Sequence, residues 1–520
     1  MAYAPAHRCK VPICETEETY QDIFDPEWLQ FAIPLKDTST NYLGGDQDYN
    51  GCLVYNQSLD LDPKVDLYCQ NNTFLNITSK CEEFVYDKTY FDETLSTALN
   101  LVCDNQSYRS LLGTILIIGL LFGSLIGGRI GDQFGRKKAC FGAIALIVPT
   151  TIIAGHVESY YAYAILHFIT MGCLPVIWVN CYVYSTEIFT PKWRYIFIGL
   201  YEIPIGYYIF NLIGYLNRTW TGIHIWVGIV TALILPVYFI LPESVRWLAQ
   251  NNKETEAMEV LKKVAKINQK ALSTEDEEKV RVLVHAIAEE SHQTEDKLTP
   301  IGNNFDFGHF DEISLKILFT DMFRNGHAIK SLILCLAWIT SCISFYALSL
   351  NTSDLSGDIM LNFFLARTSG FGVAIIIVLV ANFLGRTLSL TISHTILGWS
   401  CIGLAFIPSE NRYAVLVVYI LANIVASVSF NLVYLMTCEL YPTNLRSQAV
   451  GSASTISRVF CAVAPYLGLL AKIYRPLPML VIGVVILISA VLSFFLPETY
   501  RKKLPQTMEN ARELKNVTRS

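Results

Sequence analysis

The sequence predicts an all-α membrane protein made of two homologous helix bundles, and three observations lead to this fold class. Hydrophobic residues make up 52% of the 520 residues and charged residues only 16%, so a soluble globule would keep many apolar side chains on its surface. Eleven apolar stretches are each long enough to cross a bilayer, which takes about 20 residues. Short motifs also recur in the same order in the two halves of the chain.

Residues 1–107 precede the first apolar stretch and have the composition of an extracellular domain. They contain an even number of cysteines, namely Cys9, Cys14, Cys52, Cys69, Cys81 and Cys103. In an oxidising compartment six cysteines predict three disulfides, with fifteen possible connectivities. Asn-x-Ser/Thr sequons, the acceptors of N-linked glycans, occur at Asn56, Asn71, Asn76 and Asn105. We therefore expect an extracellular, cysteine-rich and glycosylated domain.

Two groups of apolar stretches follow, with a polar segment between them. The first group, within residues 108–241, has five predicted spans at 110–130, 138–157, 161–183, 196–216 and 221–241. The second group, within residues 329–496, has six at 329–350, 359–382, 387–407, 413–436, 447–471 and 476–496. The linker at 242–328 is charged and shows helical periodicity in "KETEAMEVLKKVAKI". A tail at 497–520 completes the predicted order.

The distribution of Lys and Arg predicts how the spans are oriented. Loops on the side of the linker contain most of these residues, including Arg129, Arg136, Lys137, Lys138, Lys192, Arg194, Arg386 and Arg446. Because positively charged loops stay on the cytoplasmic side, we expect the linker and the C-terminus to be cytoplasmic. The cysteine-rich domain then lies outside the cell, which places the protein in the plasma membrane.

An internal repeat supports two homologous bundles. "GGRIGDQFGRKK" at 127–138 is echoed by "VLVANFLGRT" at 378–387, and "TEIFTPKWR" at 186–194 is echoed by "CELYPTNLR" at 438–446. "LPES" at 241–244 is echoed by "LPET" at 496–499. The corresponding positions are 250, 252 and 255 residues apart. A nearly constant offset in three ordered motifs predicts that the second bundle repeats the first.

The first motif resembles the loop signature of the major facilitator superfamily. The matching residues are Gly128, Asp132, Gly135, Arg136 and Lys137. Gln133 departs from the usual basic residue, and Asn382 and Phe383 replace the acidic and basic pair in the second copy. The resemblance implies the major facilitator fold, in which two helix bundles rock about a central site.

The resemblance further implies a cytoplasmic gate at these motifs. The expected gate residues are Gly128, Asp132, Gly135, Arg136, Glu187, Arg194, Gly385, Arg386, Glu439 and Arg446. Glycines allow a tight turn between helices, and the charged residues are expected to form breakable ion pairs that hold the inner ends of the bundles together. The alternative, that the arginines are ordinary positive-inside anchors, does not explain the paired glutamates.

Within the superfamily the chain resembles the organic cation, organic anion and carnitine transporter family. The resemblance rests on the cysteine-rich domain and on "PESVRWLAQ", "FYALSLNTSDLSGD" and "SFNLVYLMTCELYP". Members of this fold have six helices in each half, so five spans before the linker predict that the first helix is missing and that 11 of 12 spans are present. We interpret this as a truncated gene model, a fragment or a short isoform. "GLLFGSLIG" at 119–127 predicts close helix packing.

Two arginines inside predicted spans are the main candidates for substrate binding. Arg458 lies twelve residues into its span and Arg367 nine residues into another. A charge at that depth normally faces a cavity or a partner. In the family, anion and carnitine transporters tend to have Arg at the position of Arg458 where cation transporters have Asp, and the family's acidic residue near Arg367 aligns with Gly370. Both features favour an anionic or zwitterionic substrate.

Alternative roles for these residues stay open at this point. Arg458 could form an internal ion pair with Glu202 or Glu439. Five aromatic residues lie on helices that the fold places around the cavity, namely Trp338, Phe345, Tyr346, Phe430 and Tyr434. They could stack on organic substrates or surround a quaternary ammonium group, or they could simply pack the helices.

The sequence favours a transporter over an enzyme. It contains no phosphate-binding G-x-x-x-x-G-K-[ST] loop, no H-E-x-x-H zinc motif and no G-x-S-x-G elbow. We expect no cofactor and no metal. The expected partners are a small organic ion as substrate, the lipid bilayer and a co-transported or exchanged ion, with no nucleic acid. A polyspecific organic cation transporter and a non-transporting surface protein remain as alternatives.

Overall fold

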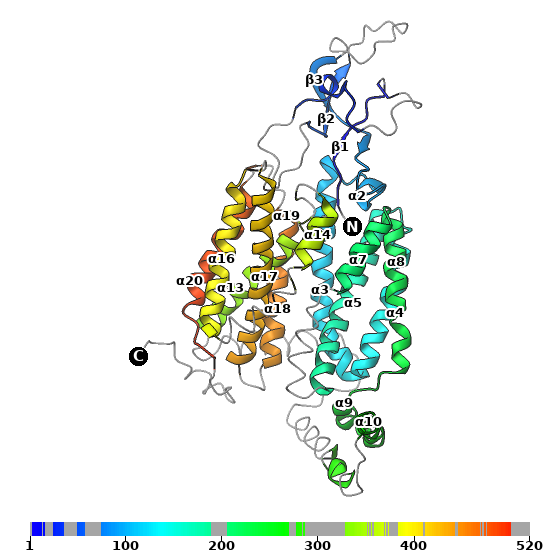
Figure 1. Ribbon diagram of the computed structural model, residues 1–520, viewed down its shortest axis with the longest axis vertical. Coiled ribbons are helices and arrows are strands. Elements are labelled where there is room, and N and C mark those ends of the chain that lie inside the picture. Colours follow the sequence, from blue (N-terminus) through cyan, green and yellow to red (C-terminus); the bar gives the residue numbers. More distant parts are fainter. Residues whose placement is uncertain are drawn as a thin grey trace, which may run out of the picture.

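The computed structural model describes most of the two bundles and parts of the other regions. The described residues are 3–12, 14–15, 24–35, 49–57, 74–188, 205–269, 277–282, 284–285, 328–350, 352, 355, 358–368, 370, 373, 383–408, 411–441, 446–467, 470, 473–474 and 476–500. Two helix bundles stand side by side in Figure 1, with short strands at one end and the small helices α9 (Val245–Gln250) and α10 (Glu254–Ile267) at the other. We call these the domain end and the linker end.

Each bundle is formed by one half of the chain. The first half contributes α3 (Gln106–Phe134), α4 (Arg136–Ala154), α5 (Tyr160–Ile188), α7 (Ile205–Leu216), α8 (Trp220–Ala232) and the 3-10 helix η3 (Leu235–Phe239). The second half contributes α13 (Ala328–Leu350), α14 (Ile359–Thr368), α16 (Arg386–Phe406), α17 (Arg412–Leu440), α18 (Arg446–Cys461), α19 (Ala464–Leu467) and α20 (Leu477–Ser493). The order of these helices follows that of the predicted spans.

Most of the predicted spans correspond to long apolar helices. Within the described residues, 7 helices are long and apolar enough to cross a membrane, and α7, α14 and α20 are shorter apolar helices. The helix predicted at 447–471 ends at Cys461 and resumes as α19, where Pro465 cannot donate a backbone hydrogen bond. The count of eleven spans stays a prediction, because residues 189–204 and most of 369–382 lie outside the description.

Small residues bring α3 and α5 into close contact, as the glycine pattern at 119–127 predicts. A Cβ atom on Gly119 would lie 2.8 Å from the carbonyl oxygen of Phe168. A Cβ atom on Gly123 would lie only 1.9 Å from the carbonyl oxygen of Gly172. Glycine is therefore required at Gly123, because any side chain would force the two backbones apart.

The N-terminal domain contains two small antiparallel sheets. β1 (His7–Cys9) pairs with β4 (Phe84–Tyr86), and β2 (Leu53–Gln57) pairs with β3 (Phe74–Lys80). Disulfides join Cys9 to Cys81 and Cys52 to Cys103. Cys14 is also disulfide-bonded, whereas Cys69 lies outside the described residues. Among the sequon residues, Asn76 and Asn105 are exposed and Asn56 is half-buried, and Asn71 is not described.

The N-terminal domain is anchored to the first bundle. In the loop between α7 and α8, the Arg218 side chain donates hydrogen bonds to the carbonyl oxygens of Lys88, Thr89 and Tyr90. The backbone of the same loop accepts a hydrogen bond from the amide of Asp92. The domain and this end of the first bundle therefore form one continuous hydrogen-bonded unit.

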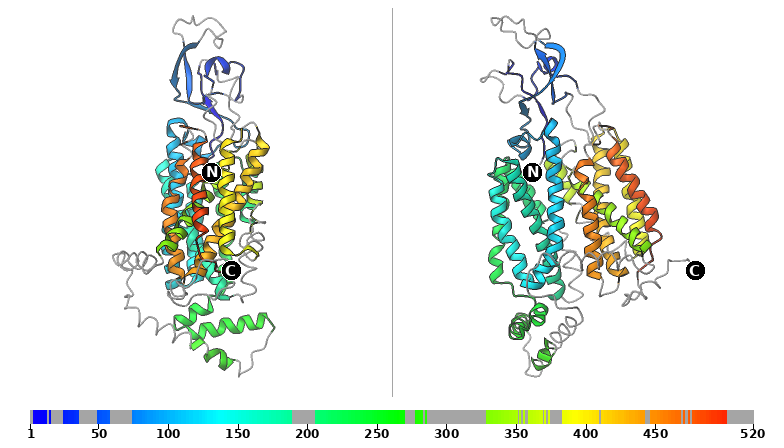
Figure 2. Two further views of the ribbon diagram at one scale, coloured as in Figure 1. Left: turned by 90° about the vertical axis from the view of Figure 1, so that its left-hand side faces the viewer. Right: turned by 180° about the vertical axis from the view of Figure 1, so that it is seen from behind.

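At the linker end, two helices continue from the first bundle. These are α9 (Val245–Gln250) and α10 (Glu254–Ile267), and the second confirms the helix predicted from periodicity in the linker. Buried Trp247, Leu248 and Met258 pack them against each other. Both views in Figure 2 place this small unit at the opposite end from the strands.

The two halves meet between their middle and the domain end. Helix α3 packs against α18 and α19, and α7 packs against α14. The Thr114 hydroxyl donates to the carbonyl oxygen of Ala462 (2.8 Å), and the Tyr208 hydroxyl donates to Thr368 Oγ1 (3.1 Å). These contacts bring helices of both halves around Arg458.

Candidate functional site

Arg458 lies at the meeting point of the two halves. It belongs to α18 and is 8% exposed. Its Nη1 donates to the hydroxyl of Ser454 on the same helix and to Ser124 Oγ on α3, 3.3 Å away. The hydroxyl of Tyr434 on α17 also interacts with the guanidinium. Arg458 therefore lies where helices of both halves meet, and its depth in the membrane stays a prediction.

Among the described residues, Arg458 has no carboxylate partner. Its Nε is buried without a hydrogen bond, and the groups that contact Nη1 are neutral hydroxyls. Glu439, one of the two partners that the sequence left open, instead pairs with Arg386, and Glu202 is not described. Because a buried charge without a counter-ion is costly, a bound anion would stabilise Arg458.

Four aromatic side chains form a partly exposed wall beside Arg458. Phe345 and Phe430 stack with ring centroids 5.4 Å apart, and Tyr346 and Tyr434 contact them edge-on. Each of these four residues retains accessible surface. The wall is built by α13 and α17 of the second half.

Of the two roles that the sequence left open for Trp338, substrate contact and helix packing, its environment in the structure fits packing. It is 0% exposed and packs behind Phe430 and Tyr434, with its Nε1 donating to Thr437 Oγ1 at 2.9 Å. The indole is large and has a single polar atom, so burying it against a hydroxyl acceptor stabilises the helix pair. In this conformation Trp338 supports the aromatic wall.

Arg367 lies apart from the Arg458 group, on α14. Its guanidinium carbon is 4.5 Å from the centroid of the Tyr207 ring on α7. This cation–π contact joins the two halves, next to the hydrogen bond between Tyr208 and Thr368. Arg367 therefore takes part in the contact between bundles and does not meet the other predicted substrate residues.

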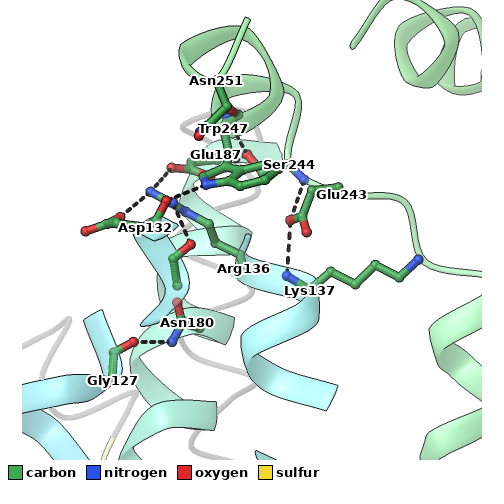
Figure 3. Close-up of polar contacts among 11 residues, drawn as sticks. Gly127, Asp132, Arg136, Lys137, Asn180, Glu187, Glu243, Ser244, Trp247 and Asn251 are labelled. Atoms are coloured by element: carbon green, nitrogen blue, oxygen red, sulfur yellow. Dashed lines mark hydrogen bonds and ion pairs between the residues drawn. The ribbon is translucent and has the colours of Figure 1, made fainter. Parts of the chain in front are cut away.

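The predicted gate residues of the first half form a network at the linker end (Figure 3). Gly135 separates α3 from α4 with φ +100° and ψ 147°. The turn directs the buried Arg136 side chain to Asp132 (2.8 Å) and to Glu187 on α5 (3.5 Å). Its Nη1 also donates to the Gly131 carbonyl oxygen at 3.0 Å, at the negative end of the α3 dipole.

The second half repeats this network. Gly385 has φ +84° before α16, and Arg386 Nε donates to both carboxylate oxygens of Glu439 at 3.3 Å. The Thr499 hydroxyl donates to Glu439 at 2.6 Å, as Ser244 donates to Glu187 in the first half. The two motif copies therefore place equivalent side chains in equivalent contacts.

These ion pairs differ from the predicted latch in one respect. The pairs that the structure shows join helices of the same half, α3, α4 and α5 in one and α16 and α17 in the other. The tight glycine turn explains this, because it points each arginine back towards its own bundle. Arg194 and the side chain of Arg446 lie outside the description. Gly128 is in α3, and a Cβ atom added to it would meet no described atom within 4 Å.

Two further network members, Glu243 and Glu498, were missed by sequence reasoning. Glu243 Oε1 accepts the backbone N–H of Lys137 at 3.1 Å. Glu498 accepts the backbone N–H groups of Arg386 at 2.8 Å and Thr387 at 3.1 Å. Each carboxylate therefore sits at the positive N-terminal end of a helix. The repeat of LPES and LPET contained this signal.

We expect Glu498→Gln to lower the free energy of unfolding by about 1–2 kcal/mol, because the neutral amide loses its attraction to the N-terminus of α16. The midpoint of thermal unfolding of the purified protein measures this. Glu259→Gln, which removes the same charge from an exposed position of α10, is the matched control. An equal shift in both variants would contradict the capping role.

Comparison with protein families supports this architecture. Residues 68–510 match the model of the family described as "Sugar (and other) transporter". The organic cation transporter protein of Drosophila melanogaster is 27% identical over 84% of this chain and 77% of its own length. Organic cation/carnitine transporter 2 of Mus musculus is 26% identical over 99% of this chain and 88% of its own length.

Solved structures support the same fold. The xylose transporter XylE of E. coli, in a structure described as an inward open conformation, aligns with a TM-score of 0.57 at 16% identity. The alignment covers 79% of this chain and 92% of the transporter. The chain therefore shares the overall fold of this transporter.

Proposed function

The chain belongs to the sugar (and other) transporter family of the major facilitator superfamily, with organic cation/carnitine transporters as relatives, and from this premise we propose its substrate. It moves small organic ions that contain a carboxylate, either anions or carnitine-like zwitterions, across the plasma membrane. The observation that carries this proposal is Arg458, buried between the halves with neutral partners in the described part of the chain.

Arg458 suits a carboxylate for geometric reasons. A guanidinium offers parallel N–H donors that match the two oxygens of a carboxylate. Its Nε is buried and has no hydrogen-bond partner in the structure, so this donor is unused. A cationic substrate would instead meet a positive charge of the same sign, and the low polarity of the surroundings would strengthen the repulsion.

The aromatic wall supports a zwitterion as well as a simple anion. Phe345, Phe430 and Tyr434 offer ring faces and edges within the same group of helices. Ring faces attract quaternary ammonium groups through cation–π contacts. A substrate with a carboxylate on Arg458 and an ammonium group against these rings would satisfy both features.

Transport follows the alternating access of this fold. The halves meet from Arg458 towards the domain end, through α3 with α18 and α7 with α14. In the proposed orientation the N-terminal domain is extracellular and the linker is cytoplasmic, so this arrangement is closed to the outside. The ion pairs of Arg136 and Arg386 keep each half rigid while the halves rock.

Uptake by cells that display the protein at their surface tests this proposal. We expect a trimethylammonio carboxylate or an aryl carboxylate to accumulate, while the methyl ester of the zwitterion, which is a cation of similar size, does not. Accumulation of the ester alone would overturn the assignment of charge. Failure of every organic ion in the panel to accumulate would overturn transport itself.

A polyspecific cation transporter is the second candidate. Two observations favour it: the relatives that are named organic cation transporters and the aromatic wall, which would also bind a cation. In that case the cation would lie against the rings, and Arg458 would serve the contact with Ser124 on α3. The ester in the uptake experiment separates the two candidates.

A further inference from the structure

A groove outside the substrate site lies on the surface of the first bundle. It is formed between the first turns of α4 and the 3-10 helix η3, near the linker end, and has a volume of about 360 Å³. Lys138, Phe141, Gly142, Leu235, Tyr238 and Phe239 line it. Its walls are aromatic and aliphatic side chains, and the ammonium group of Lys138 lies at the end nearest the linker.

The groove faces the membrane. Along α4, exposed Lys138, Gly142, Leu146 and Ile153 follow one another at helical spacing, so one stripe of the helix is turned away from the bundle. On the other wall Phe239 is 85% exposed. Apolar side chains that are this exposed are more stable in contact with lipid acyl chains than in contact with water.

Gly142 leaves space on this face of α4, and no packing among the described residues requires a glycine there. A Cβ atom at this position would meet nothing within 4 Å, in contrast to Gly119 and Gly123. On the opposite wall, Pro236 lies within η3, and Leu235 and Tyr238 of this short helix pack against the first turns of α4 at Phe141. The space is therefore present without being filled by the described residues.

The polar end of the groove is positively charged. Lys138 is exposed and forms no ion pair with any carboxylate among the described residues. Its neighbour Lys137 lies with Nζ 4.1 Å from the centroid of the Tyr238 ring. Lysine and tyrosine at the end of a membrane helix lie at the depth of the lipid headgroups. The positive charge of Lys138 is therefore expected at the headgroup level, and the apolar hollow next to it at the level of the acyl chains.

We propose that this groove binds an anionic phospholipid of the leaflet at the linker end. The phosphate and the acidic headgroup lie at Lys138, and one acyl chain lies over Gly142 between Phe141 and Leu235. Charge selects the headgroup, since basic pockets beside membrane helices on the cytoplasmic side attract anionic lipids. Shape selects the chain, because the hollow is apolar and open along its length.

Photolabelling in nanodiscs tests the site. The purified full chain is placed in phosphatidylcholine nanodiscs that contain a small share of a photoreactive probe lipid. The probe is either phosphatidylserine or phosphatidylcholine, each with the same photoreactive acyl chain. We expect the phosphatidylserine probe to label peptides containing 138–142 and 235–239 more strongly than the phosphatidylcholine probe. Lys138→Gln should lower phosphatidylserine labelling about fivefold, and Lys138→Arg should retain it.

Gly142→Leu is designed to fill the hollow without disturbing the fold, because a Cβ atom at this position meets no described atom within 4 Å. It should abolish labelling of both peptides. Gly403→Leu on α16 is the matched control, since Gly403 is also free of neighbours within 4 Å, and should leave labelling intact. Equal labelling by the two probes would overturn the headgroup selection, and labelling unchanged by Gly142→Leu would overturn the site.

Discussion

Arg458→Ala is expected to lower uptake of a carboxylate substrate at least about 30-fold. Truncating one partner of a buried, hydrogen-bonded charge pair costs about 2–5 kcal/mol, and each 1.4 kcal/mol is a factor of about ten. Arg458 is buried and bonded only to neutral groups among the described residues, so its removal leaves the bound carboxylate without a counter-charge. Initial uptake rates, corrected for the amount of protein at the cell surface, measure the effect.

Two further arginine variants make this result specific. Arg458→Lys keeps the charge but loses the planar fork, and should retain part of the uptake. Arg367→Ala removes a cation that lies against Tyr207, and not beside Arg458. It should change uptake by a smaller factor, since an exposed cation–π contact contributes about 0.5–1 kcal/mol. Equal losses in Arg458→Ala and Arg367→Ala would contradict a special role for Arg458.

Gly135→Ala is expected to lower the free energy of unfolding by about 3 kcal/mol. The combination of φ +100° and ψ 147° lies in a region that essentially only glycine populates, and other residues there cost about 1–3 kcal/mol. In addition, the new Cβ would lie 2.4 Å from Glu243 Oε2, so the carboxylate that caps α4 must move. Thermal unfolding of the purified protein is the measurement.

The repeat provides a second copy of this experiment. Gly385→Ala should have a similar effect, because its Cβ would lie 2.6 Å from Glu498 Oε2 at φ +84°. Gly142→Ala on the same helix α4 is the control, since its Cβ meets nothing within 4 Å. Wild-type stability in Gly135→Ala would refute the proposed turn geometry.

The bundles could be predicted from the sequence because their cause is local. A helix that crosses a bilayer needs a continuous apolar stretch, and such stretches are visible without any tertiary information. Helix ends were predicted less well. Helix α3 runs to Phe134, beyond the apolar stretch that was expected to end at 130, because the helix continues through the polar motif until Gly135 breaks it.

For the gate motifs, the sequence predicted which residues matter but not which residues they contact. The repeat pointed to Arg136 and Arg386, but the residues that they contact depend on how distant parts of the chain come together in space. Glu243 reaches the N-terminus of α4 from a position 106 residues away, and no spacing rule predicts that contact. For the same reason the sequence did not show that the ion pairs of Arg136 and Arg386 with described residues each lie within one half.

The candidate substrate residues also differ in how well the sequence alone could identify them. Arg458 could be singled out because a charge in an apolar span is costly. An aromatic residue gives no such signal, because rings serve packing and binding equally well. The structure adds the exposure of each ring: Trp338 has no exposed surface, whereas Phe345 and Phe430 keep some.

The central claim is that Arg458 binds the carboxylate of an organic ion. The most direct measurement is the ratio of the dissociation constants of a carboxylate and of its neutral carboxamide for the purified protein, with Arg458→Gln alongside. We predict that the wild-type protein binds the carboxylate at least about tenfold more tightly, which corresponds to about 1.4 kcal/mol, and that Arg458→Gln loses this preference. A ratio near one for the wild-type protein, or a preference that survives in Arg458→Gln, would contradict the account.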